Sequence, residues 1–141
     1  MPDTTPLPLS LQGKVVVQFG GTGLLGPALI DAAVAAGATV VIASRNRDSL
    51  KDIVAAHAAA GHTVHPEEVD QHSEPSLHAL RDRILAQHGR IDGVVYNSAS
   101  RPMKSFADDL AAWRQSMDDN ATGFIATIRT FGDAIDRKSV V

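Results

Sequence analysis

One stretch decides the fold of this 141-residue chain: Lys14-Val15-Val16-Val17-Gln18-Phe19-Gly20-Gly21-Thr22-Gly23-Leu24-Leu25-Gly26. Its first six residues form a β-branched run that is apolar on both faces, which is typical of a strand buried in a parallel sheet. The glycines that follow permit a tight turn. Helical spacing then continues to Ala36, and Gly37 ends it. Strand, glycine turn and helix in this order predict the start of a βαβ unit.

The same alternation continues to the end of the chain. Pro66 indicates that the third strand lies at a sheet edge, because proline cannot donate to a ladder. Right-handed crossovers predict an α/β fold, a Rossmann-type doubly wound parallel sheet with strand order 3-2-1-4. The expected strands are 14–19, 39–43, 63–69 and 91–96; the expected helices are 24–36, 50–58 after a Ser49 cap, 73–88, and 108–136 with an interruption near Asn120 and Gly123.

Composition excludes several classes of protein. Hydrophobic residues make up 44% and charged residues 21%, as in ordinary globular domains. The formal net charge of −3 and the lack of a Lys/Arg run disfavour nucleic-acid binding. No stretch has the length of a membrane span, the N-terminus lacks a secretion signal, and there is no cysteine. We therefore expect a cytoplasmic protein without disulfides or thiol chemistry.

The glycine turn carries the strongest chemical signal. Gly20, Gly23 and Gly26 stand between a strand and a helix, where glycines let the backbone approach a pyrophosphate. The helix N-terminus adds free N–H groups and partial positive charge, and Pro27 suits the first helical turn. A plain tight turn between strand and helix is the alternative interpretation.

Arg45 follows the second strand, where a dinucleotide site meets the adenine ribose. An acid there accepts a hydrogen bond from the 2′-hydroxyl of NAD, whereas an arginine suits the 2′-phosphate of NADP. Ser44, Arg45 and Asn46 fill this place, and Arg47 lies close by. The sequence favours NADP, with NAD possible; a solvated loop arginine is the alternative.

Five segments together resemble the short-chain dehydrogenases/reductases over about residues 9–135. They are Leu11-x-Gly13-Lys14-Val15, the glycine turn, Val69-Asp70, Gly89-x-Ile91-Asp92-x-Val94-Val95-x-Asn97, and Trp113-x-x-x-Met117-x-x-Asn120-x-x-Gly123. The resemblance implies that Asp70 meets the adenine amino group and that Asn97 closes the fourth strand beside the cofactor. It also implies that Asn120 holds a water in the proton relay, as the one catalytic residue present.

The resemblance also implies a domain organisation, a cofactor site and a substrate class. Pro2, Pro6 and Pro8 predict a flexible tail over residues 1–10, and the resemblance implies that residues 11–141 are an incomplete NAD(P)-binding domain that acts on a small alcohol or carbonyl. No metal ligand is expected. The cofactor-binding residues implied are Gly20, Gly21, Thr22, Gly23, Leu24, Leu25, Gly26, Ser44, Arg45, Asn46, Asp70, Gln71, Asn97, Ser98 and Ala99.

Some features depart from the family pattern. Phe19 replaces the usual Thr or Ser, Leu24 interrupts one glycine pattern, and Asn97-Ser98-Ala99 replaces Asn-Ala-Gly. The catalytic Tyr-x-x-x-Lys is absent: Tyr96 is the single tyrosine, and the residue four places later is Ser100. The chain is therefore expected to stop before the catalytic residues, with Ser139-Val140-Val141 starting a fifth strand, and to be inactive alone.

Other patterns have plainer explanations. His62-x-x-His65 places its rings on opposite faces of a strand, so solvated histidines are expected rather than a metal site. Asp118 and Asp119 are expected on a solvated helix face. Trp113, Met117, Phe124 and Ile128 are expected to pack in a core or an interface.

Three functional hypotheses remain open. The chain is part of an NADP-dependent oxidoreductase, a dinucleotide-binding module without catalysis, or an inactive remnant. An open edge at residues 91–96 and uncovered apolar side chains, including Phe131, predict a homo-oligomer through residues 108–136, or aggregation.

Overall fold

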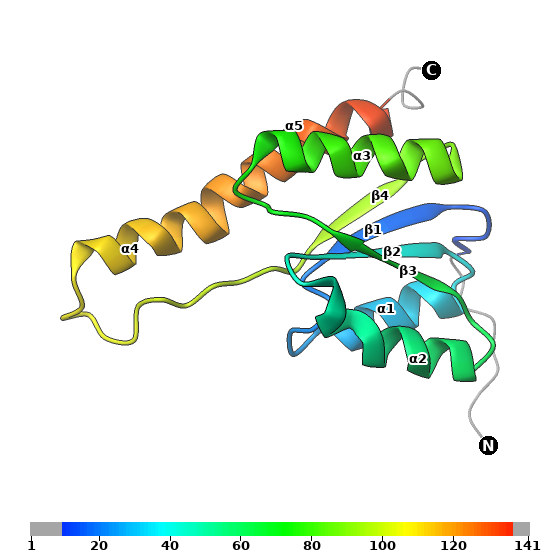
Figure 1. Ribbon diagram of the computed structural model, residues 1–141, viewed down its shortest axis with the longest axis horizontal. Helices are drawn as coiled ribbons and strands as arrows, with labels where there is room; N and C mark the ends of the chain where they lie inside the picture. The colour runs from blue at the N-terminus through cyan, green and yellow to red at the C-terminus, as the bar shows by residue number, and fades with distance from the viewer. Residues whose placement is uncertain (1–9, 137–141) are drawn as a thin grey trace.

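The computed structural model describes residues 10–136, and the side chain of Asp136 is not described. A parallel sheet lies between two layers of helices (Figure 1). The strands are β1 (Val15–Phe19), β2 (Thr39–Ser44), β3 (Val64–Glu68) and β4 (Gly93–Tyr96). The helices are α1 (Gly26–Ala35), α2 (Lys51–Ala59), α3 (Glu74–His88), α4 (Leu110–Met117) and α5 (Gly123–Asp136), with a 3-10 turn η1 (Arg47–Leu50) and a π-helical turn η2 (Asp118–Thr122).

The predicted strand order is confirmed. The strands are arranged β3-β2-β1-β4 and every described pairing is parallel. The register sets Phe19 opposite Ala43 on one side and Tyr96 on the other, so three strands end at one edge of the sheet. β3 lies at a sheet edge and contains Pro66, as predicted. β4 is the other edge strand within the described residues.

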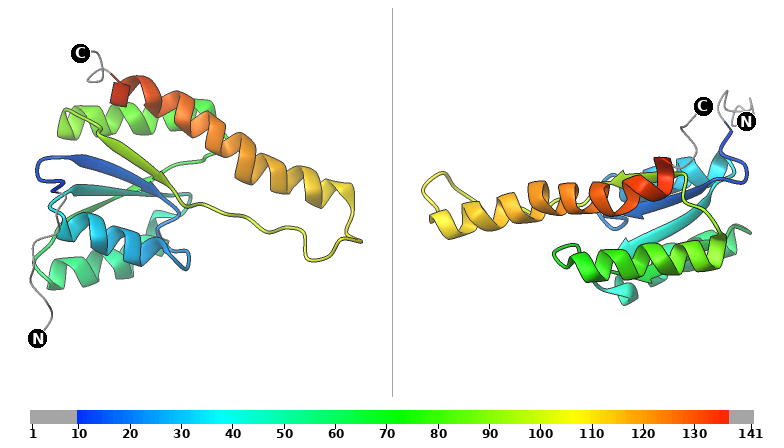
Figure 2. Two further views of the ribbon diagram at one scale, coloured as in Figure 1. Left: turned by 180° about the vertical axis from the view of Figure 1, so that it is seen from behind. Right: turned by 90° about the horizontal axis from the view of Figure 1, so that it is seen from above.

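Alternate residues of the strands belong to two separate hydrophobic cores, one on each face of the sheet. Val17 and Phe19 of β1 face α3 and α5, where they pack with Leu80 and Phe131. The opposite face of the sheet meets α1 and α2 around Ile42 and its neighbours. Figure 2 shows these two helical layers from behind and from above. A strand that is apolar on both faces is thus explained by a helix on each side.

Most helix ends match their sequence signals. Ser73 caps α3, because its side chain accepts a hydrogen bond from the N–H of Ser76. Gly37 and Gly89 follow helices with φ of 91° and 73°. The Ser49 cap was wrong: Asn46 accepts from the N–H of Asp48, and η1 intervenes before α2. Asn46 is the cap because it has extended backbone and directly precedes η1, where its side chain can accept from an N–H of the turn.

The long C-terminal helix is interrupted as predicted. α4 ends at Met117, the π-helical turn η2 follows, and α5 begins at Gly123. α4 and the connection before it extend beyond the sheet (Figures 1 and 2). We call residues 101–117 the arm, and the sheet with α1, α2, α3 and α5 the body.

The exposure of apolar side chains decides part of one prediction. Trp113, Met117, Phe124 and Ile128 are 42–50% exposed, so they do not lie in a core of the described chain, and their packing in an interface stays a prediction. Phe131 is only 1% exposed, so its predicted uncovering was wrong, because Phe19 and α3 cover it. In the part of the chain that the structure describes, no helix is long and apolar enough to cross a membrane.

Candidate functional site

The glycine turn lies where β1 ends and α1 begins. The N–H of Gly23 donates to the Gly20 carbonyl at 3.4 Å, and the N–H of Gly26 donates to the Gly23 carbonyl at 3.0 Å. Leu25 precedes α1 and supplies no side-chain cap. Gly26 thus uses its N–H inside the turn and Pro27 has none, so the first turn of α1 offers an anion mainly its positive dipole end.

Gly20 is required by the neighbouring strand. Its φ is +76°, and a Cβ there would lie 2.5 Å from the backbone carbon and oxygen of Asn97. The Asn97 side chain donates to the Gly20 carbonyl at 3.2 Å. The end of β4 thus presses against the turn, so any larger residue at Gly20 meets protein backbone before it can meet a ligand.

Two further glycines allow the turn to pack closely against the body. A Cβ on Gly21 would lie 2.5 Å from Ile42, and a Cβ on Gly26 would overlap the Gly21 carbonyl. Gln18, which is 1% exposed, donates from Nε2 to the Gly26 carbonyl at 3.0 Å. The sequence analysis missed Gln18, although a lone amide in a buried apolar strand indicates a required hydrogen bond.

The outer side of the turn is open. A Cβ on Gly23 would have no neighbour closer than 3.6 Å, and the Thr22 side chain is exposed. Leu24 is 98% exposed and Leu25 60% exposed. The same turn is therefore closed toward the protein and accessible from solvent.

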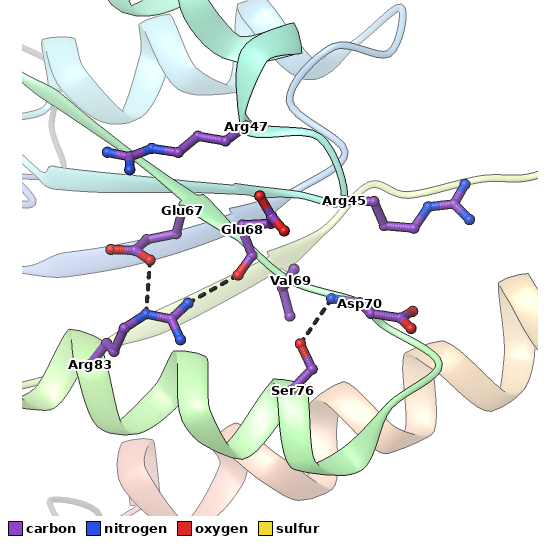
Figure 3. Close-up of a pocket in the computed structure, with 8 residues that line it drawn as sticks. All are labelled: Arg45, Arg47, Glu67, Glu68, Val69, Asp70, Ser76 and Arg83. Atoms are coloured by element: carbon purple, nitrogen blue, oxygen red, sulfur yellow. Dashed lines mark hydrogen bonds and ion pairs between the residues drawn. The ribbon is translucent and has the colours of Figure 1, made fainter.

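A hollow of about 610 Å³ lies between the loop after β2, the end of β3 and α3, and no residue of the glycine turn is among those that line it. The backbone N–H of Asn46 donates to the Ser44 hydroxyl at 3.3 Å, which shapes the loop that carries Arg45. Arg45 and the Asp70 carboxylate extend to the same side, whereas Arg47 extends to the other (Figure 3). The lining residues are Arg45, Arg47, Glu67, Glu68, Val69, Asp70, Ser76 and Arg83.

Charge in this hollow is partly compensated. Arg83 pairs with Glu67 at 3.0 Å and also donates to the Glu68 carbonyl at 2.9 Å (Figure 3). Arg45 and Arg47, in contrast, stand in exposed loop positions after β2. They are the cations that an incoming anion could reach.

The ends of β3 and β4 are joined by side chains. Gln71 donates from Nε2 to the Ser98 hydroxyl at 2.7 Å. The N–H of Asp70 donates to the Ser76 hydroxyl at 3.0 Å, which fixes the loop start. Ala99 is exposed on the connection that follows. The fold therefore gathers Gly20, Asn97, Ser98 and Gln71 at the carboxyl ends of the strands, where ligands bind in open α/β sheets.

Asn120 anchors the connection after β4. Its Oδ1 accepts from the Ser100 N–H at 2.8 Å, and its Nδ2 donates to the Ser100 and Ser116 carbonyls, each at 2.8 Å. These bonds hold the start of the arm against η2. Asn120 thus contacts the 97–100 connection, and Asn97 at the start of that connection contacts the glycine turn.

Asp119 is an unexpected member of the site, and its placement on a solvated face was wrong. Its Oδ1 lies 2.6 Å from Nε2 of His72, and its carbonyl accepts from the Tyr96 hydroxyl at 3.1 Å. Hydrogen bonding from Ser100, then from His72, and the charge of Arg45 lower the pKa of the Asp119 carboxyl. Burial, followed by the Asp119 charge, raises the pKa of Tyr96.

Residues 10–136 contain no group of three or more His, Asp or Glu side chains arranged to hold a metal ion. The Tyr-x-x-x-Lys motif is absent from the sequence. What the site offers is an open glycine turn, exposed arginines and a polar edge formed by three strand ends.

Comparison with known proteins identifies a family and individual relatives that this chain resembles. The short chain dehydrogenase family profile matches residues 14–140. A 2,5-dichloro-2,5-cyclohexadiene-1,4-diol dehydrogenase of Sphingobium indicum is 34% identical over 116 residues, which are 80% of this chain and 45% of that protein. An uncharacterized oxidoreductase of Mycobacterium tuberculosis is 42% identical over 81 residues, 57% of this chain and 32% of that protein.

Solved structures agree on the fold. A short-chain type dehydrogenase/reductase from Mycobacterium marinum superposes with a TM-score of 0.86 at 23% identity, over 93% of this chain and 53% of that one. One from Mycobacterium ulcerans gives 0.78 at 30% identity, over 92% and 49%. This chain spans about half the length of the relatives it matches. On this match and on the 3-2-1-4 sheet, the chain belongs to the short chain dehydrogenase family.

Proposed function

We propose that this chain is the cofactor-binding portion of an oxidoreductase and that it binds NADP(H). One observation carries the proposal: the glycine turn is sealed against the body by Gly20, Gly21 and Gly26 but is open on its outer side. An extended anion such as a pyrophosphate fits that open side, because the turn exposes backbone at the N-terminus of α1.

The polar residues around the turn fit the rest of the cofactor. Asp70 would accept from the adenine amino group, and Ser44, Arg45 and Asn46 would surround the adenine ribose. Thr22, Leu24 and Leu25 would lie along the phosphates, and Asn97, Ser98 and Ala99 would lie on the nicotinamide side. This assignment follows the family resemblance, and the gathering of these strand ends at one edge supports it.

The choice of NADP rests on Arg45. Its side chain extends from the loop after β2 toward the same side as Asp70 (Figure 3). A guanidinium binds a phosphate through charge-assisted, often paired hydrogen bonds. Arg47 extends to the opposite side, and Arg83 is already paired with Glu67. NAD, without a 2′-phosphate, would gain nothing from Arg45.

The reaction we propose for the whole protein interconverts a small alcohol and its carbonyl compound. When bound, the nicotinamide cofactor would supply or accept the hydride. Asn120, through its hydrogen bonds to Ser100 and Ser116, would hold the arm beside the site. The sequence has no Tyr-x-x-x-Lys, so we expect these 141 residues alone to bind cofactor without measurable turnover. That absence equally favours a second candidate, a dinucleotide-binding module without catalysis.

Titration of the purified chain with NADPH and NADH tests the cofactor proposal. Arg45→Asp should weaken NADPH binding by roughly 10- to 100-fold, the equivalent of a charged hydrogen bond. NADH binding should change little. Arg129→Asp, an exposed charge reversal on α5, is the matched control. Equal affinity for both nucleotides in wild type and Arg45→Asp would refute the role of Arg45; no binding of either nucleotide would refute the proposed function.

We also propose that residues 11–141 act as one dinucleotide-binding domain. Residues 1–9 of the expected tail and the expected strand start at 139–141 lie outside the described residues.

We further propose that the chain associates with a second copy through residues 108–136. Exposed Leu110, Trp113, Ile125 and Ile128 support the association, since large apolar patches drive contacts. Sedimentation at several concentrations should show a dimer or larger species, and Trp113→Glu should shift it toward monomer; a concentration-independent monomer contradicts it.

A further inference from the structure

Two segments of the candidate site meet at the π-helical turn η2. The loop between β3 and α3 carries Asp70, which the cofactor proposal places at the adenine. The connection after β4 carries residues 97–99, which it places on the nicotinamide side. Gln71 and Ser98 join the two segments directly through one hydrogen bond. Because η2 contacts both segments, it can fix the spacing between the two ends of the site.

One side chain of η2 holds the adenine-side loop. Oδ1 of Asp119 lies 2.6 Å from Nε2 of His72, and the Asp119 side chain is only 13% exposed. With its lowered pKa, the Asp119 carboxylate is ionised near neutral pH and only accepts hydrogen bonds. Nε2 of His72 therefore carries the shared proton, which a neutral ring supplies as well as a charged one. The contact holds the loop against η2 in either charge state of the ring.

Other groups of the same turn hold β4 and its connection. The Tyr96 hydroxyl donates to the Asp119 carbonyl at 3.1 Å. Oδ1 of Asn120 accepts from the N–H of Ser100 at 2.8 Å, and its Nδ2 donates to the Ser100 carbonyl at the same distance. A Cβ on Gly123, directly after the turn, would lie 2.9 Å from the Tyr96 hydroxyl. The end of β4 therefore packs closely against η2.

The Asp70 carboxylate does not depend on the His72 ring. Its Oδ1 accepts from the backbone N–H of His72 at 3.0 Å, and the N–H of Asp70 donates to the Ser76 hydroxyl at 3.0 Å. Loss of the ring would leave these bonds in place and would remove the contact between the loop and η2. The shape of the loop and its position relative to β4 can therefore be tested separately.

We propose that Asp119 is a positioning residue for the cofactor: through His72 it fixes the adenine-side loop against the turn that also holds the end of β4. This rests on the proposed cofactor site. A dinucleotide contacts both segments at once, so its affinity gains from a fixed spacing between them. A nucleotide that ends at the adenine side contacts one segment and gains little. An ion pair that only stabilised the fold would not distinguish the two ligands.

The test compares NADP⁺ with adenosine 2′,5′-bisphosphate, which keeps the adenine and the 2′-phosphate but lacks the nicotinamide half. Asp119→Ala should weaken binding of NADP⁺ to the full chain by about three- to tenfold, the equivalent of one hydrogen bond. Binding of the bisphosphate should change by less than about twofold, because it does not span the two segments. Asp119→Asn should restore most of the NADP⁺ affinity, because its amide oxygen still accepts from His72.

His72→Ala approaches the same contact from the other side, because it removes the ring and keeps the backbone N–H that holds Asp70. It should give the same difference between the two ligands. The double variant with Asp119→Ala should lose no more affinity than either single variant, since each change removes the same contact. Asp118→Ala is the matched control: Asp118 is exposed in the same turn, and its carboxylate accepts from Thr122 at 3.3 Å. It should bind both ligands as wild type does.

Several results would overturn the inference while leaving the proposed function intact. They are equal weakening of both ligands in Asp119→Ala, NADP⁺ binding unchanged in Asp119→Ala, and additive losses in the double variant. Wild type that binds neither ligand overturns the proposed function and this role with it.

A second measurement needs no Asp119 variant, in case that variant fails to fold. Nitrogen NMR of the wild-type chain reports which ring nitrogen of His72 carries a proton, with His72→Ala to assign the signal. A proton on Nε2 supports the contact with Asp119. An Nε2 without a proton overturns the inference, because a carboxylate cannot donate to it.

Discussion

The body and the arm use the same kinds of side chain with opposite results. In the body, Phe19 and Phe131 are almost fully buried, and their rings pack edge to face at 5.8 Å. In the arm, Phe106 is 101% exposed and Trp113 is 50% exposed. The spacing of apolar residues therefore predicts which face of a helix is apolar. It does not predict whether that face is buried against the described part of the chain.

The largest expected difference is between two phenylalanines. Phe131→Ala should lower the free energy of unfolding by about 3–5 kcal/mol, since it removes a buried ring and leaves a cavity. Phe106→Ala should change it by less than about 0.5 kcal/mol, since its ring is exposed. Denaturant titration of both variants measures the contrast. Similar losses in both would mean that the arm packs in solution, against the chain or against another copy.

A smaller difference is expected between two glycines with positive φ. Gly20 and Gly61 have φ of +76° and +79°, but only Gly20 would place a Cβ against backbone, at 2.5 Å from Asn97. Gly61→Ala should cost about 1–2 kcal/mol for its backbone conformation. Gly20→Ala should cost about 1–3 kcal/mol more, because the strands must separate. Equal losses in chemical denaturation would show that the approach of β4 to the turn is unimportant for stability.

The smallest expected effect concerns the outer edge of the body. His65 of β3 lies against His88 of α3, with ring centroids 4.7 Å apart. Burial, and then the charge of His88, lower the pKa of His65, although Glu67 acts in the opposite direction. The folded state therefore binds a proton less readily than the unfolded state, so stability falls as pH drops below the ordinary histidine value of about 6.5.

His65→Gln should flatten that dependence. We expect the free energy of unfolding to rise by less than about 1 kcal/mol between roughly pH 5 and pH 7 in wild type, because solvent screens a partly exposed group. The rise should be smaller in His65→Gln and unchanged in His78→Gln, an exposed control. A steeper rise in His65→Gln than in wild type would contradict the direction of this pKa shift.

The fold was predictable because its signals are local. The β-branched runs with apolar residues on both faces predicted strands with helices on each side, and the glycines after them predicted the turns. Strand order followed from the handedness of crossovers and is confirmed. The Ser49 cap was wrong because two capping residues competed within four positions, and only backbone conformation selects between them.

Many residues of the candidate site could be identified from the sequence, but the contacts that they make could not. The glycine spacing identified the turn, yet the reason for Gly20 is the backbone of Asn97, 77 residues later. The pairing of His72 with Asp119 joins residues 47 apart, and no periodicity links them. Gln18 could have been noticed as a polar residue in an apolar strand; its partner could not.

The sequence by itself determined the alternation of strands and helices, the glycine turn and the family, because each depends on residues near one another in the chain. The tertiary structure decided which groups meet: Asn97 with Gly20, Gln71 with Ser98, and His72 with Asp119. It also decided that the arm extends beyond the body with its apolar side chains exposed (Figure 1). Contacts between distant segments depend on how the layers pack as a whole, and a one-dimensional pattern does not record that packing.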